Sequence, residues 1–233
     1  MNIKKISLFL VSVFFFISTQ AQYGRKMRDS EIDQMNSERQ IKELKENVLL
    51  VRLRTRQPVI DALVKAERNE EAKKVELDQL QKNQEIIAAF DQYFDFCPVF
   101  FFRSNYSEYI IKNQLDSIVF LNDTAGLDPG IKVQSKLFYL AEITGLAADT
   151  STFENGTYLA ENEDGLVRRT AYAGGGNTGF QALIFKSSAM YQLRRPFPYY
   201  SRTLQSLPIF RRSHKRVISR ANDALHYYYN KVY

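Results

Sequence analysis

The sequence predicts an α/β or α+β fold. A mixed sheet of about five to seven strands would carry an N-terminal helical hairpin and a C-terminal amphipathic helix. Apolar residues recur at helical spacing near both ends of the chain, and short apolar runs lie between them. From Pro58 to Leu121 the helix and strand patterns alternate, which is typical of β-α-β units with parallel strands.

The N-terminus has the layout of a secretory signal peptide over residues 1–21. Lys4 and Lys5 precede the uncharged apolar run Ile6–Ile17, and small residues then lead to a predicted cleavage position between Ala21 and Gln22. The run is shorter than the about 20 apolar residues that span a membrane, so an uncleaved anchor is the less favoured alternative. We expect an exported bacterial protein that is periplasmic, outer-membrane-associated or secreted, with no transmembrane segment in the mature chain.

The rest of the chain is predicted to be a mobile leader and one domain. The expected parts are the leader 22–29 and the domain 30–233, divided into an acidic helical part 30–95, a sheet-rich part 96–212 and a C-terminal helix 213–231. Ser30 is the expected N-cap of a helix that runs to about Glu46. Residues 48–53 are interpreted as a strand, with a continuing helix as the alternative.

Pro58 suits the first turn of a helix, and the apolar periodicity that continues to Phe94 predicts a helical hairpin or one long bent helix. A short helix is expected at 106–115, and Ser213 is expected to cap the last helix. Further strands are predicted at 97–102, 117–121, 136–144, 157–160, 167–173, 181–185 and 190–193.

Charge is distributed unevenly along the chain. The net charge is +6, but residues 166–233 hold 12 Lys and Arg against a single acid, Asp223, and the preceding residues 22–165 are net negative. Such a division indicates either an anionic partner for the basic part or pairing between the two parts of the molecule.

The basic third contains the candidate binding residues. Guanidinium groups contact phosphate or carboxylate in a bidentate manner, and aromatic faces beside them can stack on ligands. The alternative interpretation is that these residues pair with the acidic helices between Glu31 and Glu85 of the same fold, or with a second copy. The predicted binding residues are Arg194, Arg195, Arg202, Arg211, Arg212, Lys215 and Arg216.

Two other motifs are interpreted as structural. Gly174–Gly179 matches G-x-G-x-x-G, but a predicted strand follows where a dinucleotide site needs a helix, so we expect a flexible hairpin loop. Cys97 is the single cysteine, so no disulfide can form within one molecule. Its aromatic surroundings predict a buried, unreactive thiol.

No catalytic or metal-binding motif is found in the sequence. His214 and His226 are too far apart for a metal pair on one helix face, and His226 could bond to Asp223. The acidic loops 122–128 and 161–164 offer oxygen ligands for Ca²⁺, but they lack EF-hand spacing, and ordinary turns explain them as well. We therefore expect no cofactor and no metal site.

The leading functional hypothesis is a non-enzymatic binding or structural domain of the cell envelope. Its partner would be an anionic lipid, a glycan or an acidic protein, and nucleic acid is not expected because the chain is predicted to be exported. The alternative is a secreted hydrolase acting on glycan or peptide with unassigned carboxylates. Whether the protein forms a homo-oligomer is left open.

Overall fold

Strand β1 (Val48–Leu53) is the centre of a seven-stranded mixed sheet, with strand order β4-β3-β2-β1-β5-β8-β9. The computed structural model describes residues 29–146, 157–162, 165–170, 181–204 and 211–233. Strand β1 is parallel to both of its neighbours, β2 (Val99–Arg103) and β5 (Phe138–Gly145). Its burial on both faces agrees with its four consecutive apolar residues, Val48–Val51.

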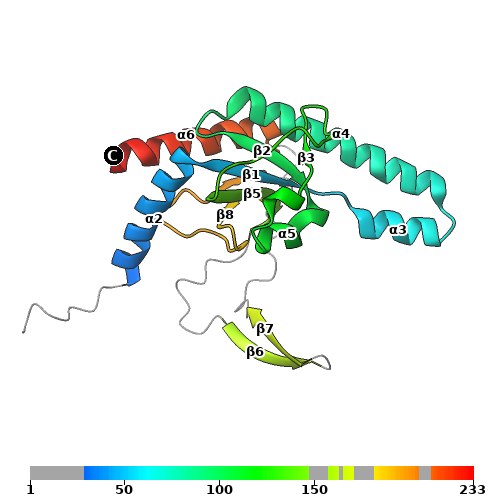
Figure 1. Cartoon of the computed structure of the whole chain (residues 1–233), viewed down its shortest axis with the longest axis horizontal. Helices are drawn as coiled ribbons and strands as arrows, with labels where there is room; N and C mark the ends of the chain where they lie inside the picture. Colours follow the sequence, from blue (N-terminus) through cyan, green and yellow to red (C-terminus); the bar gives the residue numbers. More distant parts are fainter. Residues whose placement is uncertain (1–28, 147–156, 163–164, 171–180, 205–210) are drawn as a thin grey trace, which may run out of the picture.

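Helices connect the parallel strands, as the sequence predicts. Helix α2 (Asp29–Glu46) precedes β1, so Ser30 lies inside this helix rather than at the predicted N-cap position. Helices α3 (Gln57–Lys65) and α4 (Asn69–Tyr93) form the expected hairpin between β1 and β2 (Figure 1). Pro58 lies in the first turn of α3, where its missing N–H costs no hydrogen bond.

The remaining strands of the sheet are antiparallel to their neighbours. They are β3 (Phe120–Leu121), β4 (Leu127–Asp128), β8 (Gln181–Lys186) and β9 (Tyr200–Arg202). A separate two-stranded sheet consists of β6 (Thr157–Asn162) and β7 (Gly165–Thr170).

Each face of the sheet has its own hydrophobic core because side chains alternate along a strand. On one face, Leu49, Val51 and Leu53 pack with residues of α2, α4 and the last helix, α6 (His214–Val232). On the other face, Leu50 packs with Ile110 of α5 (Ser107–Ile111) and with residues of neighbouring strands. In Figure 1, α6 runs beside α4 and α5 lies on the other side of the sheet.

Two predicted strands differ from the structure. The segment 190–193 contributes only the isolated bridge between Lys186 and Gln192. The turn closed by the Met190 N–H and the Ser187 carbonyl brings the chain back beside the end of β8, but the pairing there does not extend into a strand. The segment 117–121 forms a strand only at its last two residues, because Leu115–Ser117 is a 3₁₀ turn. The predicted short helix at 106–115 is likewise divided, into α5 and two 3₁₀ turns (Ser104–Tyr106 and Leu115–Ser117).

Ser213 caps α6 as predicted, and its hydroxyl accepts the Arg216 N–H. None of the helices in the described ranges combines the length and apolar character needed to cross a membrane.

Asn222 attaches α6 to the turn between α4 and β2. Its Oδ1 accepts the N–H groups of Asp95 (3.1 Å) and Phe96 (3.2 Å), and its Nδ2 donates to the Asp95 carboxylate (2.9 Å). The Asn222 side chain therefore satisfies backbone donors that follow the end of α4.

Replacing Asn222 by Ala is expected to lower the free energy of unfolding by about 1.5 kcal/mol, because the backbone N–H of the buried Phe96 loses its acceptor. Urea denaturation measures the change. Asn230→Ala is the matched control, since Asn230 is exposed on the same helix and the substitution has the same helix propensity. Equal effects of the two substitutions would contradict a role for the Asn222 contacts.

Candidate functional site

The predicted binding residues of the basic third lie at several separate positions in the structure. Arg202 ends β9, next to the N-terminal end of β8, where it pairs with Ala182. Arg194 and Arg195 follow Leu193, whose N–H donates to Phe185 near the opposite end of β8. The predicted residues therefore do not form one continuous surface.

Four arginines do come together, and we call them the arginine cluster: Arg202, Arg212, Arg216 and Arg220. Arg216 and Arg220 are four residues apart and share one face of α6. The side chains of Arg202, Arg216 and Arg220 are exposed, whereas that of Arg212 is half-buried.

Hydrogen bonds between three chain segments place Arg212 beside Arg202. The Arg212 N–H donates to the Thr203 carbonyl at 2.9 Å, and its guanidinium Nη1 donates to the Arg202 carbonyl at 3.2 Å. Thr203 is itself held by the Gln181 carbonyl, which accepts both its N–H and its hydroxyl. The edge of the sheet thus fixes the start of α6 and aligns the arginines from both segments.

The cluster concentrates positive charge. Burial lowers the pKa of Arg212, and the positive charges of Arg220, Arg216 and Arg202 lower it further. Arg202 also lies over the Tyr200 ring, with its guanidinium carbon 5.5 Å from the ring centroid, so an aromatic face accompanies the cations.

The carboxylates of the described residues do not pair with three of these arginines. No carboxylate among the described residues lies within ion-pair distance of Arg212, Arg216 or Arg220. Within α2, Glu43 and Glu46 instead pair with Arg39 and Lys42 of the same helix.

Lys215 and Arg211 point elsewhere. The Lys215 ammonium lies over the Tyr93 ring of α4, 4.6 Å from the centroid. Arg211 lines a cavity between α4 and the sheet. Both residues adjoin cluster members in the sequence, but their side chains lie at other places in the structure.

Arg220 is the cluster member that sequence reasoning missed. The predicted binding residues lie in or near dense runs of basic residues, whereas Arg220 stands alone between Ser219 and Ala221. The four-residue spacing from Arg216 within the predicted helix was the available signal.

Cys97 is buried, and both histidines contact carboxylates from other segments of the chain. Cys97 is buried, as predicted, and burial raises the pKa of its thiol to about 12, which leaves almost no reactive thiolate at neutral pH. The predicted bond from His226 to Asp223 is wrong: His226 Nε2 lies 2.8 Å from the Asp95 carboxylate. His214 instead contacts Glu85 at 3.5 Å.

The acidic loop at 122–128 forms a turn that uses the side-chain oxygen of Asn122 for hydrogen bonds within the loop. Asn122 Oδ1 accepts bonds from the Thr124 N–H, the Thr124 hydroxyl and the Gly126 N–H. Within the ranges that the structure describes, no group of three or more His, Cys, Asp or Glu side chains is arranged to hold a metal ion. The glycine run Gly174–Gly179 and the side chains of loop 161–164 lie outside the described residues, as do the leader 22–28 and the cleavage position between Ala21 and Gln22.

Comparison with protein-family models, curated proteins and solved structures yields no match to this chain.

Proposed function

We propose that the protein is an exported, non-enzymatic binding domain of a bacterial cell envelope. Its arginine cluster would contact an anionic envelope component that carries repeated phosphate or carboxylate groups. The observation that carries the proposal is the convergence of Arg202, Arg212, Arg216 and Arg220, three of which are exposed, with no ion-pairing carboxylate of the described residues near Arg212, Arg216 or Arg220. Guanidinium groups suit phosphate and carboxylate because they donate two parallel hydrogen bonds.

The cluster is unfavourable for the isolated fold, which supports a role in binding. Arg216 and Arg220 are like charges at i, i+4, a spacing that weakens a helix. Lys215 and Arg216 also lie in the first turn of α6, at the positive end of the helix dipole, and this turn contains no acidic residue. An anionic partner would relieve both unfavourable interactions.

Salt-dependent binding tests the proposal. The full mature chain is mixed with vesicles containing phosphatidylglycerol and, separately, with polygalacturonate, so that phosphate and carboxylate sources are distinguished. We expect binding to at least one probe at low salt and steep weakening as ionic strength rises, because exposed charges are screened beyond about 10 Å at 0.1 M salt. Vesicles of neutral lipid are the control. Failure to bind either anionic probe at low salt would overturn the proposal.

Export makes its own prediction. Expressed with its natural N-terminus in a bacterial host, the chain should be recovered outside the cytoplasm, and N-terminal sequencing should begin at Gln22. Replacing Ala21 by a bulky residue should leave the precursor uncleaved, because the peptidase site needs a small residue there. Recovery of the intact chain in the cytoplasm would contradict this part of the proposal.

The alternative class, a hydrolase of glycans or peptides, stays a prediction from the sequence. In the described part of the chain, the most buried carboxylate, Glu142, is held by two cations, Arg52 and Lys186. Glu85 of α4, which lines the cavity between α4 and the sheet, contacts His214.

A further inference from the structure

A cavity of about 640 Å³ lies at the carboxyl ends of the two central parallel strands. Leu53 of β1 and Ile143 of β5 line it, each two residues beyond the paired Val51 and Ala141. Its volume is in the range of sites for small molecules, about 300–1,000 Å³. We call it the strand-end pocket.

The topology of the sheet favours a ligand at this place. After β1 the chain crosses through α3 and α4 to β2 on one side, whereas β5 lies on the other side of β1 and pairs next with β8. The strands that neighbour β1 and β5, namely β2 and β8, therefore lie on opposite sides of this central pair. In open sheets with parallel strands, such a switch point leaves a crevice at the carboxyl ends of the strands, where ligands bind.

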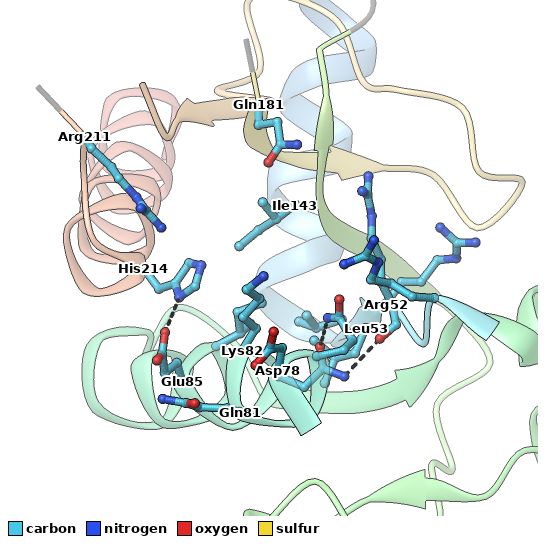
Figure 2. A pocket seen from close by; sticks show the side chains of 16 residues that line it. Arg52, Leu53, Asp78, Gln81, Lys82, Glu85, Ile143, Gln181, Arg211 and His214 are labelled. Atoms are coloured by element: carbon cyan, nitrogen blue, oxygen red, sulfur yellow. Dashed lines mark hydrogen bonds and ion pairs between the residues drawn. The ribbon is translucent and has the colours of Figure 1, made fainter. Parts of the chain in front are cut away.

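Cations from separate elements surround the strand-end pocket. Lys82 rises from α4 toward Ile143, and Arg211, just before α6, is directed toward His214 (Figure 2). Burial lowers the pKa of His214, the Glu85 carboxylate opposes this change, and the charges of Arg211 and Lys82 lower the pKa further. Both cations therefore lie close to the same imidazole.

Neither Lys82 nor Arg211 has an ion-pair partner among the carboxylates of the described residues. Arg54 and Arg56 add two positive charges at the end of β1, and Asp78 and Glu85 add two negative charges from α4. The floor of the pocket, in contrast, is apolar, since it contains Val51, Leu53 and Ile143. Gln181 adds an amide from the start of β8 (Figure 2).

We propose that the strand-end pocket binds a small organic anion through a phosphate or carboxylate group held by Lys82 and Arg211. The apolar floor would contact the body of the ligand, and the amide of Gln181 would hydrogen-bond to its polar groups. This site is separate from the arginine cluster, and its ligand is a small molecule rather than a polyanion.

Titration of the full chain with inorganic phosphate and, separately, with succinate tests the site. Amide chemical shifts report binding even when it is weak, and the two probes distinguish phosphate from carboxylate recognition. We expect saturable shifts at Lys82, Gln181 and His214 with at least one probe. Lys82→Gln and Arg211→Gln should each weaken that binding by about tenfold, because each removes a charge-assisted hydrogen bond.

Two matched controls separate the pocket from general charge effects. Lys73→Gln removes a charge from an exposed position of α4 that does not line the pocket, and Arg194→Gln does the same in the loop after β8. Both should bind the probe as the native chain does, and so should a variant with Arg216 and Arg220 replaced by Glu. Absence of saturable shifts with both probes would overturn the proposal. So would shifts that persist unchanged in Lys82→Gln and Arg211→Gln.

Discussion

Glu142→Gln is expected to lower the free energy of unfolding by about 3 kcal/mol, because it leaves two partly buried cations without their counter-charge. The Glu142 carboxylate accepts bonds from Arg52 at 2.6 Å and from Lys186 on the neighbouring strand. Its side chain is only 8% exposed, and those of Arg52 and Lys186 are 26% and 17% exposed. Without the carboxylate, water can compensate the two cations only in part.

Further contacts hold this network in place. Arg52 also donates from Nε to the Ser107 hydroxyl at 2.8 Å, and that hydroxyl donates to the Ser104 carbonyl at 2.5 Å. The network thus connects β1, β5 and β8 to the start of α5. Lys186→Met in the Glu142→Gln background should recover part of the lost stability, since it removes one of the two uncompensated cations.

The effect of Glu142→Gln should depend on pH. Burial alone raises the pKa of Glu142, but the bonds and charges of Lys186 and Arg52 outweigh it, so the pKa lies below its usual range. A lowered pKa in the folded state stabilises the protein above the unfolded-state value, about 4.3. This stabilisation disappears as the pH falls through the folded-state pKa. The native chain should therefore lose its advantage over Glu142→Gln below about pH 4.

Urea denaturation of both proteins at several pH values measures these effects. Glu108→Gln is the matched control, because Glu108 pairs with Lys112 at an exposed site where its side chain is 84% exposed. That pair should contribute less than about 0.5 kcal/mol. A loss for Glu142→Gln no greater than that for Glu108→Gln would contradict the role of the buried network.

The double replacement of Arg216 and Arg220 by Glu is expected to weaken binding to the anionic probe by at least about a hundredfold, since each basic residue near an anionic surface contributes about 1 kcal/mol. Fold stability should not decrease along with binding. An acid at position 216 lies in the first turn of α6, where the helix dipole favours negative charge. Stability should therefore be unchanged or slightly higher.

A loss of binding without a loss of stability distinguishes a binding surface from a structural one. Vesicle or polygalacturonate binding measures the affinity, and thermal unfolding measures the stability. Replacing Lys73 and Lys74 by Glu gives the same change in net charge at exposed positions of α4, and it should affect binding far less. Equal losses of binding in both double variants would mean that only net charge matters, and the arginine cluster would lose its assigned role.

Local patterns were sufficient to predict most elements of the fold. The apolar runs at β1 and β8 identified buried strands, because such strands are covered on both faces. The aromatic run at β2 identified a strand as well, but most of its residues are only half-buried. Ser213 identified the start of α6, because a hydroxyl there satisfies a free backbone N–H. The predicted strand at 190–193 is only an isolated bridge in the structure, because β9 pairs with the rest of that edge of β8.

Sequence by itself thus determined most of the elements, the parallel β-α-β connection and the basic character of the last third. Tertiary structure decided which charges meet. Strand pairing brings Arg52, Glu142 and Lys186 together, and the contact of Arg212 with β9 joins Arg202 to the arginines of α6. Propensity and periodicity act over a few residues along the chain, whereas electrostatic interactions act through space. Only the paired sheet and the helices packed on it assemble the arginine cluster from β9, Arg212 and α6 and place Arg211 in the strand-end pocket.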